Sequence, residues 1–223
     1  RFVEDLALAL PILSGVDWQD ASVIPMPLAD WQQVKMKGLR VAFYTHHAEA
    51  EPTPETAAAC RRAAQVLAAN GALVEESLPP RIEEAYTITR QYWARVESED
   101  GEEWVSSGHS QLDGDEVARH LFLWDRFRRA MIGFMAGYDL ILTPAAELPA
   151  QPQGQPEGRI PYTLPYSLTG YPAVVVRCAT SPEGMPIGVQ VVARPWREDV
   201  ALAAASVLEE ALGGWQPPRF VEK

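Results

Sequence analysis

Two apolar runs in the last third of the chain constrain its fold most strongly. AVVVRCA covers residues 173–179, PIGVQVV covers residues 186–192, and the turn signal Ser-Pro-Glu-Gly lies between them. Strands that are covered by helices on both faces show such near-continuous apolar runs. The pattern therefore predicts two adjacent central strands whose faces are both largely buried. An aspartate at Val175 is then expected to unfold the protein, because a buried carboxylate without a partner is costly.

A second pattern, strand–helix–strand, lies earlier in the chain. LRVAFYT (39–45) and ALVEE (72–76) predict short strands. Between them, Thr53 is a suitable N-cap, Pro54 fits the first helical turn, and Gly71 fits the end of the helix. A strand, a helix and a second strand in this order favour a crossover connection and a parallel strand pair.

The remaining segments predict further helices and one more buried strand. The expected fold class is α/β, with a mixed and largely buried β-sheet covered by helices. The other expected helices are residues 3–13, 82–98, 115–137 and 198–212, the strand is residues 139–143, and residues 161–170 form a short helix or turn.

Size, charge and cysteine content exclude several classes of protein. The 223 residues suit one ordinary domain or two small ones, and the formal net charge of −11 argues against binding nucleic acid or an anionic membrane surface. No apolar run approaches the length of a membrane-spanning helix. Cys60 and Cys178 form no metal or disulfide motif, so we expect small core side chains in a reducing cytoplasm. Because the chain begins with Arg1, we expect a processed or partial chain.

The residues alone indicate no self-contained active site. Ser106, Ser107, His109 and Ser110 are too close in sequence for a serine and a histidine to aim at each other. The adjacent pair His46-His47 points to opposite sides of an extended chain, and the acidic stretch 97–103 lacks a calcium-loop pattern. We therefore expect no metal, no cofactor and no catalytic residue within this chain.

The closing segment resembles the C-terminal part of the amidase signature family. Members of that family typically carry Asn-Leu-Thr-Gly-x-Pro-Ala, then Gly-x-Pro-x-Gly-x-Gln, a final helix opened by Asp, and a Trp-x-x-Pro tail. Residues 1–20 also resemble the helix after the family's catalytic core, and LILTP (140–144) resembles a strand ending in Thr-Pro. Ser167 and Phe2 depart from the pattern, since the family usually has asparagine and a small residue there. The matching positions are Leu168, Thr169, Gly170, Pro172, Ala173, Pro186, Gly188, Gln190, Asp199, Trp215 and Pro218.

The resemblance implies that residues 1–223 are the C-terminal portion of a hydrolase that cleaves a small-molecule carboxamide into a carboxylate and ammonia or an amine. The match is weakest over about 77–115. The family's two serines and neutral lysine belong to a Gly-Ser-rich stretch that would precede this chain, and Lys35 and Lys37 have no such stretch beside them. This portion would then supply scaffold and one wall of the substrate pocket. The residues expected to bind substrate are Thr143, Pro144, Tyr162, Leu168 and Thr169.

Two alternatives and one consequence follow from the missing catalytic stretch. The chain could be a non-catalytic relative with a binding or scaffold role in a larger assembly, or an unrelated α/β ligand-binding domain. The consequence is that the chain self-associates or needs a partner. Strands such as 139–143 and 173–179 would lose neighbours, and the helix 115–137 carries more apolar surface than a small sheet covers.

Overall fold

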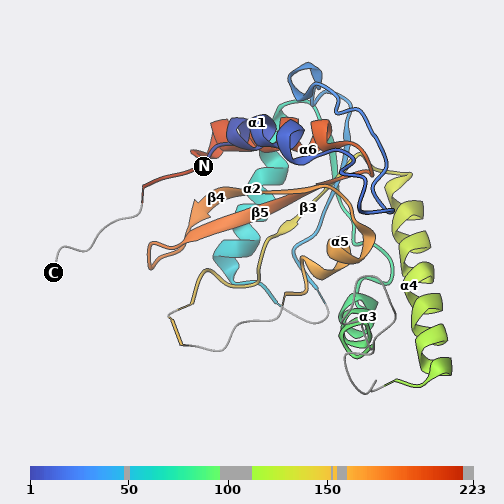
Figure 1. Ribbon diagram of the computed structural model, residues 1–223. Helices are drawn as coiled ribbons and strands as arrows, with labels where there is room; N and C mark the ends of the chain where they lie inside the picture. The colour runs from blue at the N-terminus through green and yellow to red at the C-terminus, as the bar shows by residue number, and fades with distance from the viewer. Residues whose placement is uncertain (48–50, 96–111, 152, 155–159, 218–223) are drawn as a thin grey trace.

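A five-stranded mixed sheet forms the centre of the molecule, and helices lie on both of its faces (Figure 1). The computed structural model describes residues 1–47, 51–95, 112–151, 153–154 and 160–217. The strand order is β2-β1-β3-β5-β4. The elements are α1 (Val3–Leu13), a 3-10 turn (Trp31–Gln33), β1 (Arg40–Phe43), α2 (Pro54–Ala69), β2 (Leu73–Glu76), α3 (Glu84–Trp93), α4 (Gly114–Met135), β3 (Leu140–Pro144), α5 (Leu164–Thr169), β4 (Ala173–Thr180), β5 (Pro186–Ala193) and α6 (Glu198–Leu212).

The predicted strand–helix–strand unit is confirmed. β1 and β2 pair in parallel, with Val41 opposite Val74, and α2 connects them. Thr53 caps α2, because its hydroxyl accepts a hydrogen bond from the Thr56 N–H at 3.3 Å, and Pro54 occupies the first turn. Thr53 and Pro54 thus begin the helix that connects the two parallel strands, as the sequence predicts.

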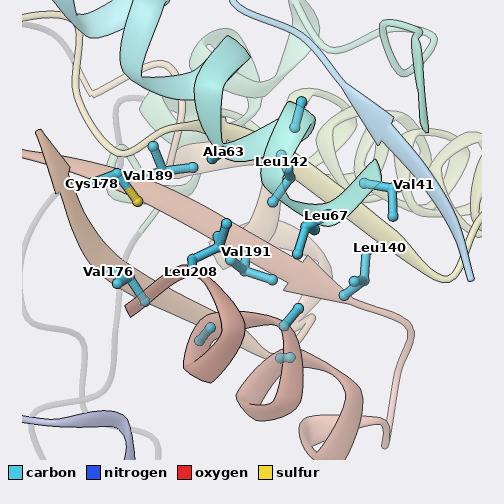
Figure 2. Packing of buried hydrophobic residues seen from close by; sticks show 14 of the residues in the cluster. Val41, Ala63, Leu67, Leu140, Leu142, Val176, Cys178, Val189, Val191 and Leu208 are labelled. Carbon is cyan, nitrogen blue, oxygen red and sulfur yellow. The ribbon is translucent and has the colours of Figure 1, made fainter. Parts of the chain in front are cut away.

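β3 is the central strand, and this explains why the sheet is mixed. It pairs in parallel with β1 and antiparallel with β5. Leu140 and Leu142 belong to the core that α2 and α6 cover, whereas Ile141 belongs to the core on the other face. Figure 2 shows the first of these cores, with Val41, Leu67 and Leu208 gathered around the strands. The mixed α/β class expected from the sequence is therefore confirmed.

The helices α3, α4 and α5 cover the second face of the sheet. An Asp113–Glu116 capping box begins α4: the Glu116 N–H donates to Asp113 Oδ1 at 2.8 Å, and the Asp113 N–H donates to Glu116 Oε2 at 3.0 Å. Phe127 and Met131 on this helix are fully buried, and Trp124 packs beside them. The expectation that the apolar stripe of this helix stays uncovered is wrong, because α3 and α5 pack near it. None of the helices in the described ranges is long and apolar enough to cross a membrane.

The position of β4 corrects the prediction made from the two apolar runs. β4 and β5 are adjacent as expected, but β4 lies at the edge of the sheet and is not central. Val176 and Cys178 on β4 are buried in the core that α2 and α6 cover. Val175 turns to the other face, where it lies over Gly188 and keeps 53% of its surface exposed. An aspartate at Val175 is therefore compatible with folding.

The expectation that strand 139–143 lacks a neighbour is also wrong. This segment is largely β3, which has a paired strand on each side. Of the two segments, only 173–179, as β4, has an open edge among the described residues. The sequence pattern could not distinguish β3 from β4, because both segments are apolar. Only the order of strands in the sheet makes β3 central and β4 an edge strand.

Candidate functional site

The carboxyl ends of β1 and β3 lie side by side and form the candidate site. The two strands are parallel, and the Tyr44 N–H beyond β1 donates to the Leu142 carbonyl of β3 at 3.1 Å. In sheets of this kind, ligands bind outside the carboxyl ends of the strands. The residues gathered there, which we call the strand-end cluster, are Tyr44, Thr45, Thr143, Pro144, Tyr162 and Tyr166.

Tyr162 ties the segment before α5 to two strands of the sheet. Its hydroxyl donates to the Thr45 carbonyl at 2.7 Å, and its own carbonyl accepts from Gln190 Nε2 of β5 at 2.9 Å. The Tyr162 ring stacks on the Tyr44 ring, with 6.2 Å between centroids, and the His47 ring meets it edge-on at 5.8 Å. Tyr162 is fully buried, so it anchors the cluster from within.

The phenols of this cluster are neutral hydrogen-bond donors and acceptors. The hydroxyls of Tyr44 and Tyr166 lie 3.0 Å apart. Burial raises the pKa of Tyr44 to about 12 and also raises the pKa of Tyr162 and Tyr166 above the ordinary value, because the anionic form would lose its hydration. At neutral pH the three phenols therefore remain protonated. They can position a polar group, but they cannot act as bases.

The structure divides the five predicted site residues into two groups. Thr143, Pro144 and Tyr162 are buried in the strand-end cluster. Leu168 lies in the core beside α4, and its carbonyl accepts from Trp124 Nε1 at 2.8 Å. Thr169 donates to the Tyr166 carbonyl at 3.2 Å and lines a separate open groove of about 480 Å³. That groove also contains Tyr171, Arg128 and Trp196.

Other candidates for chemistry are unsuited to it where the structure describes them. Burial raises the pKa of the Cys60 and Cys178 thiols to about 12, so neither is a thiolate at neutral pH. Lys35 and Lys37 are exposed, whereas a lysine base must be buried to be neutral. Within the described ranges, no group of three or more His, Cys, Asp or Glu residues could hold a metal ion. Ser106, Ser107, His109, Ser110 and the acidic stretch 97–103 lie outside the described residues.

The sequence argument missed Tyr44, Thr45 and Tyr166 of the strand-end cluster, and also Gln190, which donates to the Tyr162 carbonyl. Tyr44 and Thr45 are the last residues of the predicted strand 39–45, and Gln190 lies in a motif that the resemblance already quoted. Tyr44 and Thr45 follow the end of β1, whereas Gln190 lies within β5, opposite Thr143 of β3. Their closeness becomes visible only when β1, β3 and β5 are known to be neighbours, which the sequence pattern does not show.

A comparison of the chain with models of protein families identifies its family. The family model described as "Amidase" matches residues 1–121 and 117–202. The chain belongs to the amidase family. The match spans both halves of the sheet, so the strand-end cluster lies inside the amidase-family fold. The predicted resemblance is therefore confirmed at the level of the family.

Curated relatives and solved structures agree with the amidase family. A glutamyl-tRNA(Gln) amidotransferase subunit from Moorella thermoacetica is 28% identical over 258 residues, covering 95% of this chain and 53% of that protein. The Chloroflexus aggregans protein of the same name is 29% identical over 247 residues, covering 90% and 50%. Among solved structures, 6-aminohexanoate cyclic dimer hydrolase superposes with a TM-score of 0.71 at 28% identity, covering 95% of this chain and 53% of that one. Fatty acid amide hydrolase gives a TM-score of 0.77 at 20% identity, covering 96% and 47%, and so supports the fold alone. This amidase-family chain spans about half the length of the relatives it matches.

Proposed function

We propose that this chain is the C-terminal portion of an amide hydrolase and supplies scaffold and pocket wall, while the catalytic serines and lysine lie elsewhere. The reaction is the addition of water to a carboxamide C–N bond, which gives a carboxylate and ammonia or an amine. One observation carries the proposal: the amidase family model matches most of the chain, yet the strand-end cluster contains no serine, cysteine or lysine.

The physical requirements of the reaction support this division of labour. A serine hydroxyl attacks an amide only when an adjacent base removes its proton, and a lysine is a base only when it is buried and neutral. Donors for the oxyanion must also face the attacked carbonyl. The neutral phenols of Tyr44, Tyr162 and Tyr166 supply neither the nucleophile nor the base, and their hydroxyls already bond within the cluster, where they hold a rigid wall at the strand ends.

We further propose that the five predicted residues form this wall in two parts. Thr143, Pro144 and Tyr162 form its buried base, because all three are buried at the strand ends and Tyr162 bonds to the Thr45 carbonyl and to Gln190. Leu168 and Thr169, at the end of α5, form its outer part. Because the curated relatives are components of an amidotransferase, we propose that the whole protein also works with further protein chains. The amide substrate would bind only when the wall and the catalytic portion meet.

The purified chain is expected to release no ammonia from a panel of simple aliphatic and aromatic amides. The reason is the absence of an activated nucleophile beside the wall. Release is measured with a coupled ammonia assay against a buffer blank, with a complete amidase as the positive control. Turnover that disappears when one serine of this chain is changed to alanine would overturn the proposal.

The rival function, a non-catalytic binding or scaffold protein, is separated by the coding sequence upstream of Arg1. A Gly-Ser-rich stretch with a lysine before it, in the same reading frame, supports the hydrolase. A start codon directly before Arg1 supports the scaffold role.

A further inference from the structure

Helices α3 and α4 pack against each other (Figure 1), and a fully buried histidine of α4, His120, lies at their contact. Its Nε2 atom is 3.0 Å from the Ile88 carbonyl of α3. A carbonyl only accepts hydrogen bonds, so the proton of the neutral ring is on Nε2 and Nδ1 keeps a lone pair. Nδ1 is buried and has no hydrogen-bond partner in the part of the chain that the structure describes. A second proton on this ring would therefore meet no acceptor there.

The contacts of His120 continue to α5 through Trp124, which lies one turn further along α4. The two rings are 5.9 Å apart between centroids and inclined by 32°. Trp124 Nε1 donates to the Leu168 carbonyl of α5 at 2.8 Å, and Tyr92 of α3 meets the Trp124 ring edge-on, with 5.7 Å between centroids. The position of the His120 ring thus affects how α4 holds both α3 and α5.

The charged groups around His120 do not compensate a positive ring. Arg95, just after α3, adds a positive field, and α5 carries no charged side chain, its titratable Tyr166 being neutral. Asp115 lies in the first turn of α4, away from this contact. Burial lowers the pKa of His120, the hydrogen bond to Ile88 opposes the shift, and Arg95 adds to it. The other acids of α3 and α4 that the structure describes already pair with arginines, and these are Glu84, Glu116 and Asp125.

We propose that His120 is an acid-sensitive latch, which holds α3, α4 and α5 together while its ring is neutral and releases α5 when its ring is protonated. A charged ring that is buried without an acceptor is costly, so protonation favours a state in which the ring reaches water. Turning the ring outward breaks its bond to Ile88 and removes it from beside Trp124, which holds Leu168. The effect on a substrate pocket rests on the proposed function, because that function places Leu168 and Thr169 in the wall. The latch itself is a property of the three helices.

The direction of the pH dependence follows from the lowered pKa. The stability that the latch contributes is complete above the ordinary histidine pKa of about 6.5, and it is lost as the pH falls through this value toward the lowered pKa of the folded state. If the opened state has the ordinary pKa, opening becomes about tenfold more favourable between about pH 7.5 and about pH 5.5.

Hydrogen–deuterium exchange measures this opening, with each rate divided by the intrinsic rate at the same pH. The Gly170 N–H, which bonds to the Tyr166 carbonyl at 2.9 Å, reports on the end of α5. Protection of residues 166–170 is expected to fall by about tenfold between the two pH values. At the lower pH it is also expected to stay well below the protection of residues 189–192 of β5. Unchanged protection of α5, or equal protection of α5 and β5 at the lower pH, would overturn the proposal.

His120→Gln separates protonation from packing, because the glutamine amide can still donate to the Ile88 carbonyl but carries no charge at either pH. This variant is expected to keep the protection of α5 at neutral pH and to lose its pH response. His46→Gln is the matched control, since His46 is exposed, and it is expected to keep the response. Trp124→Phe removes the donor to Leu168 and is expected to weaken the protection of α5 already at neutral pH. The opposite result for any of the three variants would overturn the latch.

An NMR titration keeps the latch testable if His120→Gln fails to fold. The Cε1–H resonance of His120 in the wild-type chain is assigned through its nuclear Overhauser contact with the Trp124 ring. Its midpoint is expected below about 6.5, and a midpoint at or above this value would overturn the proposal. These measurements use no amide, so failure of the latch and failure of the proposed hydrolase role are distinguishable.

Discussion

Replacing Val191 by aspartate is expected to unfold the protein. Val191 lies on β5, opposite Leu142 of β3 and Val174 of β4, and none of its surface is exposed. A carboxylate placed there without a partner costs several kcal/mol, which is comparable with the whole stability of a domain, about 5–15 kcal/mol. Far-UV circular dichroism measures the loss of secondary structure, and urea titration measures the loss of unfolding free energy.

Val175→Asp is the matched control for this prediction, since it introduces the same charge on the neighbouring strand at a side chain that is 53% exposed. It is expected to keep a cooperative unfolding transition, because the carboxylate stays hydrated. A soluble, cooperatively melting Val191→Asp variant would contradict the position of β5 inside the sheet. So would a Val175→Asp variant that is as unfolded as Val191→Asp.

Tyr162→Ala is expected to give the second largest loss of stability, about 3–5 kcal/mol, as other truncations of buried aromatic residues do. The alanine would remove the ring that stacks on Tyr44 and the hydroxyl that bonds to the Thr45 carbonyl. The segment before α5 would then lose its attachment to β1. Urea unfolding followed by tyrosine and tryptophan fluorescence gives the free energy difference.

Tyr162→Phe separates the two contributions. It keeps the ring and removes only the hydroxyl, which leaves the Thr45 carbonyl without its 2.7 Å donor. The expected cost is about 1–3 kcal/mol, the usual penalty of an unsatisfied buried acceptor. If Tyr162→Ala costs no more than Tyr162→Phe, the ring does not anchor the strand ends and the proposed base of the wall is wrong.

Local signals in the sequence predicted most of the secondary structure because they act within a few residues. Thr53 and Pro54 define the start of α2. Helix α1 contains Pro11 but continues to Leu13, and the Ser14 N–H bonds to the Leu10 carbonyl at its end. The order of strands depends on contacts between distant segments. No feature of residues 173–179 indicates that β4 lies at the edge of the sheet, and its three consecutive valines resemble those of a central strand.

The dependence on contacts between distant segments also explains why the sequence predicted only part of the candidate site. Thr143, Pro144 and Tyr162 could be proposed from the family resemblance, because motifs near them are recognisable in one dimension. The residues that bond to Tyr162 are Thr45, just beyond β1, and Gln190 on β5, and both come from segments far away in the chain. Their convergence follows from the β1-β3-β5 order, which becomes known only from the folded structure.

Labelling with a serine-directed sulfonyl fluoride shows whether this chain carries an activated serine, and the result does not depend on knowing the substrate. An activated serine attacks the sulfonyl group, forms an O–S bond and releases fluoride. The folded chain is incubated with phenylmethanesulfonyl fluoride and its intact mass is measured, with a known serine hydrolase as positive control. The hydrolase is expected to be labelled, whereas the chain is expected to keep its unmodified mass. One stoichiometric adduct on a single serine, formed by the folded chain and absent after unfolding in urea, would contradict this expectation.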